Sequence, residues 1–386
     1  MNWQQHWRLR PDTIYLNHGS FGPPPIPVQQ ARLEWQHKLD EQPMDFFLRQ
    51  LEPAWFAVRD RLAKFVGTTA ANLIFVDNAT VGMNIVADSF RLSAGDEVLL
   101  TNHEYGAVER IWDRACGLVG AQRKTVELPL PFTTAAETVD RIMSAVTPRT
   151  KLIVISHITS PTAVTLPVKE VCAAARERGI ATCIDGPHAL VQEDVALDAL
   201  GCDFYTASCH KWLSAPFGTG FLYAAPVHQP NIRPPYLSWG RLPPTKLNNW
   251  ADEFLWSGTR DYAAILAIPA AIDFIESIGL KTFRAHAHSL ARYAREKLCE
   301  LTGLEPIIPD DPAWYCSMAH VPLPPGSRQP LQENLWQQFH IEIPVVEWNG
   351  GRYIRVSCHL YNEQSQVDKL LPALRELLGK EPKPAT

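Results

Sequence analysis

The chain has 386 residues, of which 46% are hydrophobic and 20% are charged, so it holds enough apolar material for about two folded domains. Its formal net charge of -5, with signs interspersed, provides neither a basic stripe for nucleic acid nor a polybasic patch for a membrane surface. The first residues lack the apolar core of a signal peptide and no stretch reaches the length of a membrane span, so we expect a cytoplasmic protein that acts on small molecules.

Two early strands are each predicted to deliver polar residues to one edge of a sheet. Residues 73–76 form an apolar run that leads through 77–84 into a helix. A helix N-terminus favours anions, so Thr80 is a candidate phosphate ligand, although a plain helix cap has the same pattern. Residues 98–101 form a second strand that places Tyr105 where its ring either stacks on a flat cofactor or packs in the ordinary way.

From residue 73 to residue 223, short apolar runs alternate with amphipathic segments of helix length, a pattern typical of an α/β fold with a mostly parallel sheet. The clearest unit has a strand at 152–156, a helix from Val168 that Gly179 ends, and a strand at 180–184. Ligands of such sheets lie outside the carboxyl ends of the strands. Asp185, Ser208 and Lys211 all follow predicted strands, which makes them candidate site residues.

Beyond residue 223 the composition changes. A Pro-rich stretch from Pro226 to Pro244 predicts a long loop around the site or a partner subunit, and its aromatic residues could line a pocket or an interface; they are Tyr236, Trp239, Trp250 and Trp256. An apolar helix over 262–278, ended by Gly279, is predicted to be buried nearly all round. Further helices and short strands predict a smaller α+β domain. We place a large domain at 17–260 and a small domain at 261–386 together with 1–16.

Lys211 is the most informative residue. A lysine at a strand end is usually exposed, but an amine is also the side chain that condenses with an aldehyde cofactor such as pyridoxal phosphate. Asp185, one strand earlier, supplies an acid that would keep the ring nitrogen protonated, and His188 could reach the ring oxygen. With Thr80 and Ser208 as an anion cup, these residues predict a pyridoxal phosphate site.

Five segments, in the same order, resemble motifs of the class V aminotransferase family of fold-type I pyridoxal phosphate enzymes. They are YLNHGSFG at 15–22, NAT at 78–80, DGPH at 185–188, SCHKW at 208–212 and SGTRD at 257–261. The resemblance covers nearly the whole chain and implies a mostly parallel sheet of the seven-stranded type covered by helices, plus a smaller α+β C-terminal domain. Within the family, these segments look most like isopenicillin N epimerase and its relatives, which include carbon–sulfur lyases.

The resemblance implies how the cofactor is held. Lys211 would carry it as a Schiff base, Asp185 would pair with the ring nitrogen and His188 would contact the ring hydroxyl. Tyr105 would stack on the ring. The phosphate cup would comprise Thr80, Val81, Ser208 and His210. Thr259 would reach the phosphate of the neighbouring subunit, so a homodimer with shared active sites is implied.

The resemblance also implies how an amino-acid substrate is bound and processed. Arg355 would bind its α-carboxylate in bidentate geometry, with Asn17 and His18 nearby. Lys211, once freed, is the expected base for the α-proton. Return of a proton on the opposite face gives an epimer and needs a second acid, for which His18 and Tyr105 are candidates. Loss of a β-sulfur group gives a lyase, and proton transfer to the cofactor gives an aminotransferase.

Cysteine positions narrow these alternatives. Desulfurases of the family carry a nucleophilic cysteine shortly before the carboxylate-binding arginine, but 340–353 contains none, so a persulfide-forming enzyme is disfavoured. A lyase that needs no enzyme thiol stays open. No Cys-x-x-Cys pair occurs and no metal site is predicted. A non-catalytic binding module with this fold would have little need for Lys211, Asp185 and Arg355 together, and the absence of Gly-x-Gly-x-x-Gly argues against a nicotinamide enzyme.

Overall fold

A seven-stranded sheet forms the centre of the computed structural model, which describes residues 3–241 and 246–381; Pro243 and Pro244 of the predicted loop lie outside these ranges. The strand order is β2 (Leu73–Val76), β8 (Gly220–Ala224), β7 (Phe204–Ser208), β6 (Ala181–Asp185), β5 (Thr150–Ser156), β3 (Glu97–Thr101) and β4 (Gln122–Val126). All pairs are parallel except the two that β8 makes with β2 and β7. The predicted mostly parallel sheet is confirmed.

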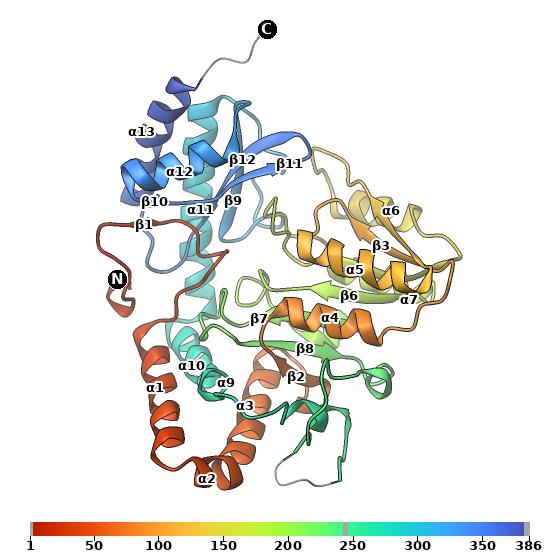
Figure 1. Cartoon of the computed structure of the whole chain (residues 1–386). Coiled ribbons are helices and arrows are strands. Elements are labelled where there is room, and N and C mark those ends of the chain that lie inside the picture. The colour runs from red at the N-terminus through yellow and green to blue at the C-terminus, as the bar shows by residue number, and fades with distance from the viewer. Residues whose placement is uncertain (1–2, 242–245, 382–386) are drawn as a thin grey trace.

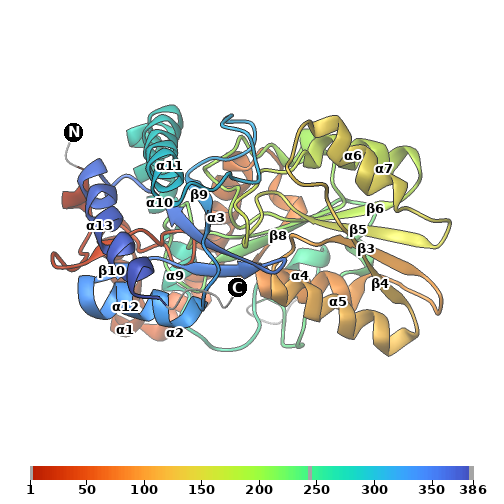
Figure 2. The same ribbon diagram turned by 90° about the horizontal axis from the view of Figure 1, so that it is seen from above.

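Helices cover both faces of this sheet (Figure 2). The helices α4 (Ala79–Ser89) and α5 (Gly106–Val119) lie on one face, and α6 (Ala135–Ser144) and α7 (Val168–Glu177) lie on the other. Alternate strand residues therefore enter two separate cores: Ile74 and Leu100 pack with Met83 of α4, whereas Phe75 and Leu99 belong to the larger core on the opposite face. Burial on both faces explains why the inner strands β3 and β5 read as continuous apolar runs, whereas the edge strand β4 is largely exposed and polar.

A second, three-stranded antiparallel sheet has the order β11 (Val345–Trp348), β12 (Gly351–Ser357) and β9 (Met318–Leu323). It packs against α11 (Leu280–Thr302), α12 (Arg328–Phe339) and α13 (Gln364–Lys380), as Figure 1 shows. The N-terminal strand β1 (Ile14–Tyr15) pairs with β10 (Ile341–Glu342), so the start of the chain lies beside this smaller unit. The predicted domain boundary near residue 260 stays a prediction.

Most of the remaining α-helices lie at the lower left of Figure 1, beside and below strands β8 and β2. They are α1 (Ile26–Glu41), α2 (Pro43–Asp45), α3 (Leu51–Phe65), α9 (Ala263–Leu266) and α10 (Ile268–Ile278), with the short α8 (Leu197–Leu200) elsewhere. The single predicted helix over 262–278 is wrong, because the chain breaks between α9 and α10 at Ala267. Pro269, in the first turn of α10, has no N–H to continue a helix from α9. Nor is α10 buried all round: Asp273 and Glu276 are exposed and pair with Arg61.

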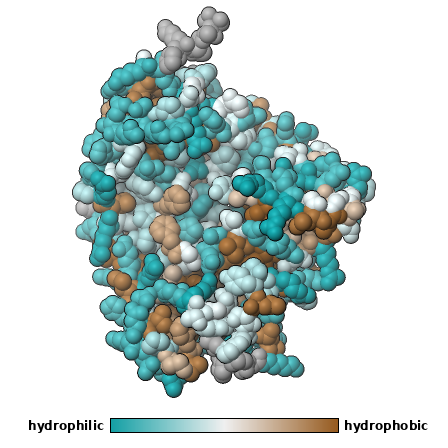
Figure 3. Space-filling model, viewed as in Figure 1, coloured by the Kyte–Doolittle hydropathy of each residue, from teal (hydrophilic) through white to brown (hydrophobic). Residues whose placement is uncertain are grey.

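Within the described ranges, no single helix is long and apolar enough to cross a membrane. Residues 263–278 and 280–302 reach that standard only when they are counted together, across a bend of 77°. On the face shown in Figure 3, most residues are hydrophilic and the hydrophobic side chains form separate patches.

Candidate active site

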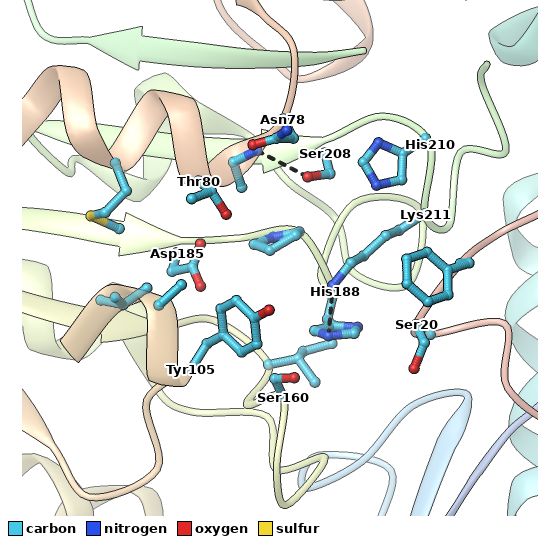
Figure 4. A pocket seen from close by; sticks show the side chains of 18 of the residues that line it. Ser20, Asn78, Thr80, Tyr105, Ser160, Asp185, His188, Ser208, His210 and Lys211 are labelled. Carbon is cyan, nitrogen blue, oxygen red and sulfur yellow. Dashed lines mark hydrogen bonds between the residues drawn. The ribbon is translucent and has the colours of Figure 1, made fainter. Parts of the chain in front are cut away.

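A cavity of about 300 Å³ opens at the carboxyl ends of β6 and β7. Figure 4 shows its side chains converging from several elements. Eight residues predicted for the site line it: Thr80, Tyr105, Asp185, His188, Ser208, His210, Lys211 and Arg355. The segment after β1 adds Gly19, Ser20 and Phe21. The cavity therefore combines residues from both sheets with the N-terminal segment.

The backbone around Lys211 is held by the antiparallel pairing of β7 with β8. Lys211 lies in the connection between these strands, where the Cys209 N–H donates to the Thr219 carbonyl at 2.9 Å. The Ser214 N–H donates to the Lys211 carbonyl, also at 2.9 Å. Burial and the nearby Arg355 charge lower the pKa of Lys211, and Asp185 opposes them. A larger share of the lysine is consequently the neutral amine, the form that condenses with an aldehyde.

His188 lies between Lys211 and Trp212. Its Nε2 is 3.1 Å from the Lys211 Nζ, and its Nδ1 accepts a hydrogen bond from the Trp212 indole at 3.2 Å. The His188 side chain is almost completely buried, and burial lowers its pKa well below the ordinary value, with Lys211 and Arg355 adding to the effect. The imidazole is therefore neutral at neutral pH.

Asp185 projects into the cavity from the end of β6 without a hydrogen-bond donor among the described residues. Burial raises the pKa of Asp185, whereas the Lys211 charge acts in the opposite direction. A buried carboxylate without a donor is costly. The N–H of a protonated pyridine ring would supply the missing donor, so this side chain fits the ring end of pyridoxal phosphate.

The start of α4 forms the candidate phosphate cup. The Ser208 Oγ accepts from the Ala79 N–H at 2.9 Å, which leaves the serine hydroxyl hydrogen for another acceptor. His210 lines the same end of the cavity, and its buried Nδ1 has no partner within 3–241 and 246–381. Val81 does not line the cavity, and its N–H already donates to the Asn78 Oδ1 at 3.0 Å. An anion at this end would meet Thr80 and Ser208 rather than Val81.

Arg355 is aimed into the cavity from β12. One terminal nitrogen donates to the Ser160 carbonyl oxygen and the other donates to the Ser20 Oγ at 3.1 Å. Burial lowers the pKa of Arg355 to about 10, so the guanidinium stays charged at neutral pH. The sequence reasoning missed both serines as site residues. Ser20 lies within the segment 15–22, whereas Ser160 lies in a loop after β5 that carries no motif.

Besides Val81, three more residues predicted for the site lie outside the cavity. His18 is fully buried behind the lysine: its Nε2 donates to the Lys211 carbonyl at 3.1 Å and its Nδ1 lies 2.9 Å from the Tyr361 hydroxyl. Asn17 donates to a carboxylate oxygen of Glu342 at 3.2 Å. Thr259 is exposed on the surface of the chain. His18 thus supports the backbone of Lys211, whereas Asn17 binds a residue of β10.

The aromatic residues of the Pro-rich loop do not line the cavity either. Tyr236 and Trp239 are exposed, whereas Trp256 is buried and stacks on Tyr262. The apolar wall instead comes from helices α4 and α5 and from the loop after β5, with Met83, Val108, Ile111 and Ile158, and Phe21 lies at the exposed rim.

Glu104 is a buried carboxyl group that the sequence reasoning did not single out. Its two oxygens accept from the Thr101 Oγ1 and the Ser156 Oγ, both at 2.6 Å, and no described residue forms an ion pair with it. Burial raises the pKa of Glu104 to about 8, with a further contribution from Asp185 and opposition from the two hydroxyls. Glu104 is therefore largely protonated at neutral pH, which leaves Asp185 as the negative charge of this region.

Comparisons with known proteins agree with this geometry. The family model for aminotransferase class-V matches residues 48–370. An isopenicillin N epimerase of Amycolatopsis lactamdurans is 38% identical over 97% of this chain and 98% of its own length. A putative L-cysteine desulfhydrase 1 of Oryza sativa subsp. japonica is 30% identical over 94% of this chain and 83% of its own.

Among solved structures, a complex of the cystine C-S lyase C-DES with its product cysteine persulfide superposes with a TM-score of 0.83 at 21% identity, covering 95% of this chain and 98% of that one. This likeness confirms the predicted fold type, and the family match together with the epimerase relative confirms the predicted family. The chain belongs to the class V aminotransferase family.

Proposed function

We propose that this chain is a pyridoxal phosphate-dependent, isopenicillin N epimerase-like enzyme that inverts the α-carbon of an amino acid or an amino-acid-containing substrate. The 38% identity to an isopenicillin N epimerase over nearly the full length supports this reaction. The cofactor, when bound, supplies an electron sink that makes the α-proton of the substrate removable. The protein's part is to bind the substrate and to hold a proton carrier on each side of the reacting carbon.

The observation that carries the proposal is that Lys211 and Tyr105 both line one cavity while coming from different elements. Figure 4 shows the Lys211 amine and the Tyr105 hydroxyl pointing into the same space. Lys211 is the base that removes the α-proton, since its lowered pKa favours the neutral amine. Tyr105 is the second proton carrier. His18 is unsuited to this role, because both of its ring nitrogens are occupied outside the cavity.

Arg355 completes the proposed substrate site. Its charge has no carboxylate partner among the described residues, and its position at the cavity suits the α-carboxylate of a substrate. The apolar wall formed by α4 and α5 adds surface for a substrate larger than the smallest amino acids.

A carbon–sulfur lyase is the second candidate, because the rice relative is named a putative L-cysteine desulfhydrase. No cysteine is among the described residues that line the cavity. The Cys316 thiol contacts Glu193 and its pKa is raised well above the ordinary value by burial, and Cys358 is buried. Such a lyase would have to release sulfur without an enzyme thiol. An aminotransferase is the third candidate.

We also propose a homodimer with shared active sites. Thr259 is exposed and lies outside the cavity of its own chain, a placement that suits a residue serving the site of a partner copy.

The test of the proposed function is incubation of the holoenzyme with isopenicillin N and a panel of amino acids in deuterated water. Deuterium at the α-carbon together with inverted configuration is the expected result. Formation of pyruvate and sulfide from cysteine would instead identify the enzyme as a lyase. Formation of a keto acid from the amino donor would identify it as an aminotransferase.

A further inference from the structure

Trp212 is linked to the side chains of the site by a hydrogen bond to His188. The Trp212 side chain is fully buried and is not among the residues that line the cavity. Its indole nitrogen can donate a hydrogen bond but cannot accept one. Because this nitrogen lies 3.2 Å from the His188 Nδ1, that Nδ1 must be the acceptor and cannot carry a proton.

We infer that Trp212 is a positioning residue that holds His188 in the tautomer with its proton on Nε2, so that His188 acts as a hydrogen-bond donor toward the Lys211 Nζ and not as a base. The His188 Nε2 is 3.1 Å from the Lys211 Nζ. A ring with its proton on Nε2 can bond to this amine only when the amine is neutral and offers its lone pair. The same N–H is the donor that the phenolic oxygen of pyridoxal phosphate requires.

His18 repeats this arrangement at the backbone of the same lysine. The Lys211 carbonyl oxygen can only accept, so the His18 Nε2 donates to it and the His18 Nδ1 accepts from the Tyr361 hydroxyl. A Cβ atom at Gly22 would lie 2.5 Å from the Lys211 carbonyl oxygen and 2.7 Å from the His18 Nε2, so only glycine leaves room for this contact. Each histidine therefore accepts a hydrogen bond at Nδ1. Its Nε2 lies against Lys211, at the amine for His188 and at the backbone carbonyl for His18.

The two donors differ in what they control. Trp212 acts on the Lys211 amine through His188, whereas Tyr361 acts on the Lys211 backbone through His18. Loss of the indole N–H would free the proton of His188 to move to Nδ1. The Nε2 could then accept from a Lys211 ammonium, which would favour the charged lysine and raise its pKa. Loss of the Tyr361 hydroxyl would leave the amine unchanged.

The experiment uses the full-length apoenzyme, so its result does not depend on which reaction the enzyme catalyses. Lys211 is acetylated with a trace of acetic anhydride across a pH series, and the peptide that contains Lys211 is quantified by mass spectrometry. In Trp212→Phe, we expect the labelling rate of Lys211 at pH 7 to fall about tenfold, as a rise of one pKa unit would produce. In the matched Tyr361→Phe variant, we expect the rate of the unaltered enzyme.

An unchanged labelling profile in Trp212→Phe, or an equal loss in Tyr361→Phe, would overturn the inference. A second measurement does not use Trp212→Phe and therefore does not depend on the folding of that variant. Long-range proton–nitrogen NMR of the histidine-labelled apoenzyme should show His188, assigned through His188→Gln, with its proton on Nε2. A His188 signal with the proton on Nδ1 would also overturn the inference.

Discussion

Arg355 donates to the Ser20 Oγ at 3.1 Å and so joins strand β12 to the segment that follows β1. Its second terminal nitrogen binds the Ser160 carbonyl oxygen, which belongs to the loop after β5. Both partners are neutral, and no described carboxylate pairs with this guanidinium. Three separate parts of the chain thus orient a buried charge without neutralising it, and the charge stays available to an anionic ligand.

Replacement of Arg355 by Lys should lower kcat/KM by about 10- to 100-fold, chiefly through KM, because Lys cannot form the bidentate pair and a hydrogen bond to a charged group contributes about 1.5–3 kcal/mol. Ser20→Ala should lower kcat/KM by about threefold to tenfold, since it removes the hydrogen bond to one terminal nitrogen of the guanidinium. Ser160→Ala is the matched control, because Ser160 acts mainly through its backbone oxygen. Steady-state kinetics provide the test, and equal effects of the two serine variants would contradict this account.

Tyr105→Phe should separate the two proton transfers. We expect inversion of the substrate to fall by about 100-fold or more, the usual contribution of an acid–base group, while Lys211 still exchanges the α-proton with solvent. Deuterium incorporation without inversion, followed by NMR and chiral chromatography, is the measurement. Tyr236→Phe is the control, because Tyr236 lies outside the cavity. Loss of exchange and inversion together would assign Tyr105 a role other than the second proton carrier.

Asp185→Asn should weaken cofactor binding by about tenfold to 100-fold, because it removes the charge that meets the ring nitrogen. Titration of the apoenzyme with pyridoxal phosphate, followed by tryptophan fluorescence, measures the affinity. Asp194→Asn is a matched charge change, since Asp194 pairs with Arg284 away from the cavity. If both variants bound the cofactor like the unaltered chain, the proposed ring-nitrogen contact would be wrong.

Local patterns predicted much of this fold and site. The alternation of strands and helices predicted the sheet, and residues just after strands, such as Asp185 and Lys211, do meet in one cavity. Contacts between distant segments were not predictable. Nothing near residue 160 in sequence indicates Arg355, and nothing around His18 indicates that Tyr361 and the lysine backbone occupy its nitrogens. The break at Ala267 within 262–278 was missed although Pro269 signals it, because the apolar residues continue on both sides of the break.

Glu104 should make stability depend on pH. The pKa of Glu104 is raised from 4.5 to about 8, so the folded chain binds its proton more tightly than the unfolded chain does. The free energy of unfolding therefore has its full value below pH 4.5 and falls as the pH rises through 8. Glu104→Gln cannot titrate, yet it can keep bonds to Thr101 and Ser156. The unfolding free energy of the unaltered chain, relative to this variant, should fall by on the order of 3 kcal/mol from pH 5 to pH 8. Urea unfolding at several pH values tests this, and parallel curves would refute it.

Thr259 provides a test of the proposed dimer. If it serves the partner's site, Lys211→Ala and Thr259→Arg should each abolish activity alone, but a refolded equal mixture should recover about a quarter of the normal activity, because each mixed symmetric dimer contains one intact site. Two Lys211→Ala preparations mixed together are the control. No recovery in a mixture shown to contain mixed dimers would exclude sharing through Thr259.

The connection between β7 and β8 also limits how the Lys211 amine can move in the cavity. Because the backbone is fixed by bonds at Cys209 and Ser214, only the side-chain torsions of Lys211 can move its amine. The amine therefore enters the cavity from the side of this connection. In the proposed reaction, the pairing of β7 with β8 would therefore fix the side of the cavity from which Lys211 reaches the α-carbon of the substrate.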